Sequence, residues 1–293
     1  MPPVPNNSIA EIDLYYERRG SGDPLLLIQG LGGNSLHWGE PLLADLERDF
    51  ELILYDHRGA GRSAALNGAC TIASLAADAA ALLDVLEIAS AHVVGISMGG
   101  MVAQELALLA PERVRTLTLG CTFPGGPEAK MTDPAVVGLL AEALLSGVGE
   151  RALRAGYDVM IAPQYAEDPA NYALYAKVAG LYPAPLPVLI AQLQAITGHD
   201  TSARLSEISV PTLVLHGTAD RLLDCVNGEL VARLIPEARL ELLEGAGHMF
   251  FWEQPERTAA LVREHAGAVR ATKDVSPKSV SQSSTAARTR PPR

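Results

Sequence analysis

The chain has 293 residues, 48% of them hydrophobic, and a formal net charge of -11. That length can enclose one large core with an inserted subdomain, and the acidic balance argues against nucleic acid and against an anionic membrane surface as partners. No run approaches the ~18 apolar residues that a membrane span requires. The first residues do not resemble a signal peptide, and the three cysteines lack metal-ligand spacing. We therefore expect a cytoplasmic protein with free thiols and with no metal or cofactor.

Apolar runs alternate with helical patterns along the chain, which is typical of a mainly parallel sheet with crossover helices. Residues 9–17 alternate in polarity and predict an early antiparallel hairpin. Residues 25–28 and 52–55 predict buried strands, and a glycine-rich turn follows the second at residues 56–63. The spacing of leucine and alanine over residues 72–86 predicts a helix. These elements form the first half of an α/β domain.

The next segment carries the most informative motif in the chain. Residues 92–96 predict a buried strand that runs through Gly95-Ile96-Ser97-Met98-Gly99 directly into a helix at residues 101–110. A serine in such a turn projects its hydroxyl into open space, and the flanking glycines leave room for the bend. Ser97 is therefore a candidate nucleophile.

The pattern changes between residues 122 and 200, where prolines cluster and the segments between them look helical. We interpret this stretch as a helical cap inserted into a core formed by residues 9–121 and 201–270. Strand patterns resume at residues 210–217 and 240–243.

The chain ends in two segments of different character. Pro255 begins an amphipathic helix that is expected to end near Arg270. Residues 271–293 are rich in Ser, Thr, Pro and Ala and carry several basic side chains. This composition predicts a disordered tail, either a solvated end or a functional arm.

A serine hydroxyl is a weak nucleophile, so it needs a base, and the base needs an orienting acid. Asp220 lies three residues past the strand that ends at Gly217, and His248 lies five residues past Leu243. Both therefore follow the carboxyl ends of strands, where open α/β sheets place their chemistry. We expect Asp220 to be the orienting acid and His248 the base.

Other residues compete for these roles. Asp224 is the alternative acid, although its place at a helix start also suits an N-cap. Trp38 and Trp252 either border the pocket or pack against the core. Six further histidines are alternative bases, and one of them, His57, could line the pocket: His37, His57, His92, His199, His216 and His265.

An acyl-transfer site also needs backbone N–H groups that stabilise the developing oxyanion. Met98, directly after the serine, supplies one at the positive end of its helix. Leu31, in the loop Gln29–Gly33, is expected to supply the other. Loss of one such donor costs on the order of 10²–10³ in rate. The alternative, a phosphate-binding turn, lacks the glycine spacing of either known nucleotide loop.

Taken together, these motifs make the chain resemble the α/β-hydrolase superfamily from about residue 9 to 270. The resemblance implies a mostly parallel sheet of about eight strands, flanked by helices, with an inserted helical cap. One departure is Gln29, where many members have histidine. Five motifs carry the resemblance: Gln29-Gly30-Leu31-Gly32, residues 56–63, residues 95–101, Gly217-Thr218-Ala219-Asp220 and Gly245-Ala246-Gly247-His248.

Within the superfamily, serine at position 97 differs from the aspartate of haloalkane dehalogenases and epoxide hydrolases. Ile96 departs from the asparagine often found in carbon–carbon bond hydrolases. The amino-acid sequence of residues 95–101 is similar to the corresponding segment of 3-oxoadipate enol-lactonases and related small-ester hydrolases, including methylesterases. The resemblance thus implies a cofactor-independent serine hydrolase that cleaves a small ester or lactone through an acyl-enzyme.

Two other functions stay open. A ligand-binding receptor on a hydrolase scaffold would retain the fold with little turnover, because fold does not fix function. A peptidase for short peptides with N-terminal proline would need acidic groups in the cap to hold the substrate amine. Seven residues offer such groups: Glu128, Asp133, Glu142, Glu150, Asp158, Glu167 and Asp168.

Overall fold

A computed structural model describes residues 13–145 and 149–274. Its described part contains one sheet of seven strands, where about eight were expected, in the order β1-β3-β2-β4-β5-β6-β7. Neighbouring strands are parallel except for β1 and β3. The strands are β1 Tyr16–Gly20, β2 Asp23–Ile28, β3 Phe50–Tyr55, β4 Ala91–Ile96, β5 Val114–Gly120, β6 Thr212–Gly217 and β7 Arg239–Leu243.

Helices cover both faces of this sheet, which is why its inner strands are buried at nearly every position. In β2, Leu25 and Leu27 pack with α1, α10 and α11, whereas Leu26 and Ile28 pack with α2 and α3 on the opposite face. The core helices are α1 Glu40–Leu46, α2 Ile72–Val85, α3 Met98–Leu109, α9 Val226–Leu234, α10 Phe250–Glu253 and α11 Pro255–Asp274. Short 3-10 helices span Ser35–Trp38, Pro111–Arg113 and Leu205–Glu207.

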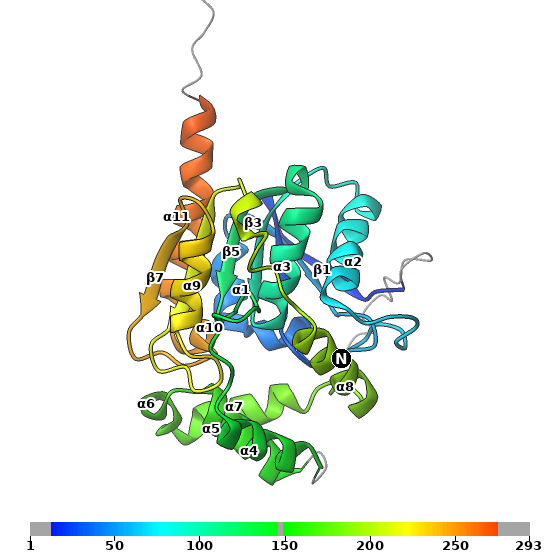
Figure 1. Cartoon of the computed structure of the whole chain (residues 1–293), viewed down its shortest axis with the longest axis vertical. Helices are drawn as coiled ribbons and strands as arrows, with labels where there is room; N and C mark the ends of the chain where they lie inside the picture. The colour runs from blue at the N-terminus through cyan, green and yellow to red at the C-terminus, as the bar shows by residue number, and fades with distance from the viewer. Residues whose placement is uncertain (1–12, 146–148, 275–293) are drawn as a thin grey trace, which may run out of the picture.

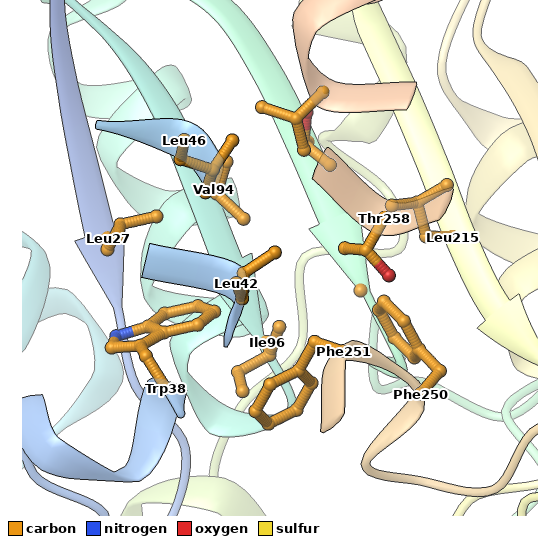
Figure 2. A pocket seen from close by; sticks show the side chains of 13 residues that line it. Leu27, Trp38, Leu42, Leu46, Val94, Ile96, Leu215, Phe250, Phe251 and Thr258 are labelled. Carbon is orange, nitrogen blue, oxygen red and sulfur yellow. The ribbon is translucent and has the colours of Figure 1, made fainter. Parts of the chain in front are cut away.

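The face with α1, α10 and α11 encloses a cavity lined almost entirely by apolar side chains (Figure 2). Trp38, Phe250 and Phe251 surround it, and Ile96 of β4 forms part of its wall. Because Ile96 directly precedes Ser97, this packing supports the strand that presents the candidate nucleophile.

Five helices between β5 and β6 group together at one end of the sheet (Figure 1). They are α4 Pro134–Leu145, α5 Glu150–Met160, α6 Pro163–Ala166, α7 Pro169–Ala179 and α8 Leu186–Thr197. We call them the α4–α8 segment. Their contacts, given below, reach the loops that follow β2, β6 and β7. We therefore propose that this segment serves as the cap expected from the proline pattern.

Two expectations about the ends of the chain need correction. The hairpin expected at residues 9–17 lies partly outside the described residues, and β1 pairs antiparallel with β3 rather than with a strand next to it in the chain. Helix α11 continues to Asp274 rather than ending near Arg270, because no glycine or proline interrupts residues 268–276. The rest of the expected tail, residues 275–293, lies outside the described residues. Among the described helices, none has the length and apolar character to cross a bilayer.

Candidate active site

Ser97 joins β4 to α3 in a strained backbone conformation. Its φ is +54°, a region that side-chain-bearing residues rarely adopt and that costs of order 1–3 kcal/mol. The strain is held on both sides: the Ser97 N–H donates to the Gly120 carbonyl at 2.9 Å, and the Thr122 hydroxyl donates to the Ser97 carbonyl at 2.8 Å. The residue is half-buried, so this turn presents a serine hydroxyl at the surface of the site.

Glycine is required beside this serine because the neighbouring backbone comes very close. A Cβ atom at Gly99 would lie 2.1 Å from the Ile28 carbonyl oxygen, and one at Gly95 would lie 2.2 Å from the Gly99 carbonyl oxygen. No side chain fits either position. The two glycines of the Gly-x-Ser-x-Gly motif are therefore required by the close packing of α3 against β2 and β4.

Asp220 and His248 meet at the carboxyl ends of β6 and β7. His248 Nδ1 lies 2.7 Å from Asp220 Oδ2, and the Asp220 side chain is fully buried. The other carboxylate oxygen accepts the N–H groups of Leu222 and Leu223 at 2.8 and 2.9 Å. Asp220 is thus fixed by its own turn, and its second oxygen orients the imidazole.

These contacts set the charges of the pair. Burial alone would raise the pKa of the Asp220 carboxyl, but the charge of His248 and hydrogen bonds from His216 and His248 outweigh it and hold that pKa well below its ordinary value. Burial likewise opposes the charged form of His248, yet the Asp220 carboxylate and the neighbouring Cys121 raise the pKa of the imidazole well above its usual value. The site therefore favours an aspartate that stays ionised beside a basic imidazole.

His216, one of the alternative bases, contacts this pair through the acid. Its Nε2 lies 3.2 Å from Asp220 Oδ2 and 2.8 Å from the Leu223 carbonyl oxygen, and its side chain is fully buried. The spacing of four residues between His216 and Asp220 was the available signal. It was uninformative without the turn that folds Asp220 back over the end of β6.

The loop after β2 lies directly against the serine. A Cβ atom at Gly30 would lie 3.5 Å from Ser97 Oγ. Within this loop the N–H of Gly30 donates to Gln29 Oε1 at 3.0 Å, and that of Gly33 donates to the Gly30 carbonyl at 3.1 Å. His57 places its Nε2 3.0 Å from the Gln29 carbonyl oxygen. The loop is therefore held rigidly next to the candidate nucleophile.

The backbone N–H groups of Leu31 and Met98 have no acceptor among the described residues. The N–H of Gly32, next to Leu31, is by contrast taken by Gln192 Oε1 of α8 at 2.8 Å. These two free donors are the ones expected to form an oxyanion hole.

The serine and the histidine are linked through the residues that follow β5. Thr122 contacts Ser97, while the buried Cys121 contacts His248. In the described part of the chain, no hydrogen bond joins Ser97 Oγ directly to His248. Catalytic hydrogen bonds are often long in empty sites and shorten when substrate binds.

The competing residues lie elsewhere or have other partners. Asp224 pairs with Lys130 and accepts the Val226 N–H at the start of α9. Trp38 is buried against Phe251, with ring centres 5.5 Å apart. Trp252 donates its indole N–H to the His37 carbonyl at 2.8 Å.

The remaining alternative bases also have other partners. Two contact protein groups away from the serine: His92 Nδ1 lies 2.8 Å from the Thr116 hydroxyl, and His265 Nε2 lies 3.1 Å from the Pro211 carbonyl oxygen. His199 packs edge-on against Phe123. No cluster of three or more His, Cys, Asp or Glu side chains in the described ranges is arranged to hold a metal ion.

Comparison with known proteins identifies the family to which the chain belongs. A model of the α/β hydrolase fold matches residues 23–255, and the chain belongs to that family. A protein of Azorhizobium caulinodans with the provisional name carbamate hydrolase RutD is 32% identical over 249 residues, which cover 84% of this chain and 92% of that protein.

Solved structures show the same likeness. The enol-lactonase from Burkholderia xenovorans LB400 is 28% identical with a TM-score of 0.75, over 87% of this chain and 96% of that one. The provisionally named non-heme bromoperoxidase BpoC from Mycobacterium tuberculosis H37Rv is 30% identical with a TM-score of 0.74, over 87% and 96% of the two chains. The resemblance and fold class expected from the sequence are thus confirmed, and the protein is a hydrolase of the α/β family.

Proposed function

We propose that the protein is a serine hydrolase that cleaves a small carboxylic ester or lactone through an acyl-enzyme. One observation carries the proposal. The strained Ser97 lies next to Met98 and to the Gln29–Gly33 loop, and among the described residues the N–H groups of Met98 and Leu31 have no acceptor. An Asp220–His248 pair lies at the carboxyl ends of β6 and β7 in the same sheet. This arrangement contains a nucleophile, a base with its orienting acid, and an oxyanion site.

The first half-reaction forms the acyl-enzyme. Ser97 Oγ attacks the substrate carbonyl carbon and His248 Nε2 takes the hydroxyl proton. The N–H groups of Leu31 and Met98 stabilise the negative charge on the carbonyl oxygen. Asp220 stays ionised and holds the imidazolium through Nδ1. The tetrahedral intermediate then expels the alkoxy group, which leaves as an alcohol with the proton from His248.

The second half-reaction regenerates the serine. His248 takes a proton from water, and the resulting hydroxide attacks the acyl carbonyl carbon. The bond to Ser97 Oγ breaks, the proton returns to the serine oxygen, and the carboxylic acid is released. In a lactone the acid and the alcohol remain parts of one product. No cofactor takes part in either half-reaction.

Carbamates are a second candidate substrate class. The relative from Azorhizobium caulinodans that is 32% identical carries carbamate hydrolase in its name. A carbamate carbonyl can be attacked by the same serine and stabilised by the same N–H groups. We keep the ester or lactone first because the residues around Ser97 resemble those of enol-lactonases, and a solved enol-lactonase shares the fold.

The peptidase alternative has less support. It requires a free carboxylate in the α4–α8 segment or its flanks to bind an amine. Most of the seven candidates already have partners on the outer surface: Glu128 with Arg233, Asp133 with the Ala135 N–H, Glu142 with Arg151, Glu150 with Tyr172, Asp158 with Arg154 and Asp168 with the Ala170 N–H.

The test compares wild type with Ser97→Ala on p-nitrophenyl acetate and butyrate, followed by a panel of lactones, methyl esters, carbamates and prolyl amides. We expect ester cleavage that Ser97→Ala abolishes, and the highest kcat/KM for an ester or lactone. Equal rates in the two proteins would remove Ser97 from the mechanism. Absence of turnover across the panel, with no labelling by a fluorophosphonate, would favour the receptor alternative.

A further inference from the structure

The loop that carries His248 is anchored on both sides of the histidine. The N–H of Gly247, the preceding residue, donates to Glu253 Oε2 at 3.0 Å, and the N–H of Met249, the following residue, donates to the Met160 carbonyl at 3.0 Å. Asp220 holds the imidazole, but these two bonds hold the backbone that carries it. The positions of the two acceptors, the Glu253 carboxylate and the Met160 carbonyl, therefore determine the position of the His248 side chain.

Both anchors lead to the same part of the α4–α8 segment. Met160 is the last residue of α5, and Ala162 lies between α5 and α6. The second oxygen of the Glu253 carboxylate accepts the Ala162 N–H at 3.0 Å. One carboxylate thus joins the N–H before His248 to the N–H at this connection, which we call the α5–α6 joint (residues 160–163).

The approach of the two backbones at this point is close. A Cβ atom at Gly247 would lie 2.7 Å from the Ala162 nitrogen and 2.9 Å from the Met160 carbonyl oxygen. Ala162 is fully buried, and burial raises the pKa of the half-buried Glu253 carboxyl, although the Ala162 and Gly247 N–H groups oppose that shift. Without Glu253, two N–H groups in a nearly closed space would lose their acceptor, which destabilises the packing of the two backbones.

Two more contacts, made by residues on either side of the joint, tie α5 and α6 to the loops of Asp220 and His248. Arg221, next to Asp220, donates to the Asp158 carbonyl at 2.9 Å, and the Gln164 side chain donates to the Gly245 carbonyl. The end of α5 and the start of α6 therefore contact the loop of the acid and the loop of the base together. The joint fixes the two loops relative to one another.

We propose that Glu253 is a positioning residue of the hydrolytic centre, which holds the His248 loop against the α5–α6 joint. This inference rests on the proposed role of His248 as the base. No hydrogen bond in the described part of the chain joins Glu253 to Ser97 or to Asp220, although the charges of the two carboxylates repel. Glu253 is bonded instead to the backbone next to His248, so its main effect on the reaction passes through the position of the histidine. The position of the His248 imidazole therefore depends on how the α4–α8 segment packs against the loop that carries it.

The first test replaces the carboxylate without changing its size. Glu253→Gln retains one acceptor oxygen and turns an NH₂ group toward the other N–H. We expect kcat to fall about 10- to 100-fold, the scale of a misplaced catalytic group, with KM little changed. Glu256→Gln, the same change at an exposed residue three positions along the chain, should leave kcat unchanged. Rates are normalised to sites titrated with a fluorophosphonate, so that unfolded protein does not count.

The second test removes the partner N–H from the opposite side. Ala162 has φ -63° and ψ 143°, and Ile161 before it is extended, so the backbone angles at position 162 suit proline. The ring carbon on the proline nitrogen would take the place of the N–H and displace the Glu253 carboxylate, which lies 3.0 Å from that nitrogen. Ala162→Pro deletes the N–H that Glu253 binds and should reproduce the loss in kcat. A normalised kcat within about twofold of wild type in either variant would overturn the proposal.

A third readout does not depend on turnover. The proton between His248 Nδ1 and Asp220 should give a low-field ¹H NMR signal in wild type, which Glu253→Gln and Ala162→Pro should shift or broaden while Glu256→Gln leaves it in place. Unchanged signals in both variants would overturn the proposal. If Ser97→Ala retains activity, the proposed function fails, but the NMR comparison still decides whether Glu253 positions the histidine.

Discussion

His248 Nδ1 lies 2.7 Å from Asp220 Oδ2 although 28 residues separate the two in the chain. The contact leaves Nε2 as the nitrogen that can exchange protons with the serine and the substrate. It also distinguishes Asp220 from its competitor Asp224, which is held by Lys130.

Asp220→Asn should therefore reduce kcat by about 10⁴, because an amide cannot stabilise the imidazolium and favours the wrong tautomer. Asp224→Asn, the matched change, should alter kcat by less than about twofold. Steady-state kinetics on p-nitrophenyl butyrate checks both. A larger loss of kcat in the Asp224 variant than in the Asp220 variant would show that Asp224, not Asp220, is the orienting acid.

The pH profile should reflect the raised pKa of His248. The base works only as neutral imidazole, so a raised pKa keeps it protonated and inactive to higher pH. We expect kcat/KM to rise with pH along a limb centred above about 6.5, the ordinary histidine value. Cys121→Ala should move this limb to lower pH, because Cys121 contributes to the raised pKa. Cys225→Ala serves as control, and a limb at the same pH in both variants would contradict the assignment.

The shape of the Gln29–Gly33 loop, which we propose supplies the Leu31 N–H to the oxyanion, should depend on Gln192, whose side chain reaches from α8 to the Gly32 N–H. Gln192→Met leaves that N–H without its acceptor and frees the loop next to Leu31. We expect kcat to fall about 10-fold, less than the 10²–10³ for loss of an oxyanion donor itself. Gln194→Met, at an exposed position two residues away, should have no effect. Equal kinetics in the two variants would show that the loop holds its shape alone.

Alanine substitutions at two glycines, one tightly enclosed and one in open space, should change the stability of the protein in opposite directions. Gly99→Ala would force a Cβ to within 2.1 Å of the Ile28 carbonyl oxygen, and we expect it to lower the free energy of unfolding by about 3 kcal/mol. Gly138→Ala lies inside α4 with nothing within 4 Å, so it should raise that free energy by about 0.5–1 kcal/mol. Urea unfolding monitored by circular dichroism measures both, and a stable Gly99→Ala protein would contradict the packing at the elbow.

Much of the site could be predicted because its parts depend on local sequence. A buried strand, a glycine-flanked serine and a helix occur together within residues 91–109, and their geometry follows from steric exclusion at Gly95 and Gly99. The meeting of Asp220 with His248 could be predicted because each follows a strand pattern. The carboxyl ends of parallel strands bring such residues to one edge of the sheet.

Other features depend on contacts between distant segments and left no local pattern. Glu253 appears as an ordinary residue at the end of a short helix, and only the approach of Ala162, 91 positions away, gives its carboxylate a second partner. The partners of β1 and the contact of Cys121 with His248 were hidden for the same reason. Helix α11 runs past its expected end because composition alone placed the boundary.

The most direct test of the account is to locate the covalent adduct that forms when the protein reacts with a fluorophosphonate. Peptide mass spectrometry should find a single modified serine, Ser97, in wild type and none in Ser97→Ala, which should also lose ester hydrolysis. Modification at another residue, or ester hydrolysis that persists in Ser97→Ala, would contradict the claim that Ser97 is the nucleophile.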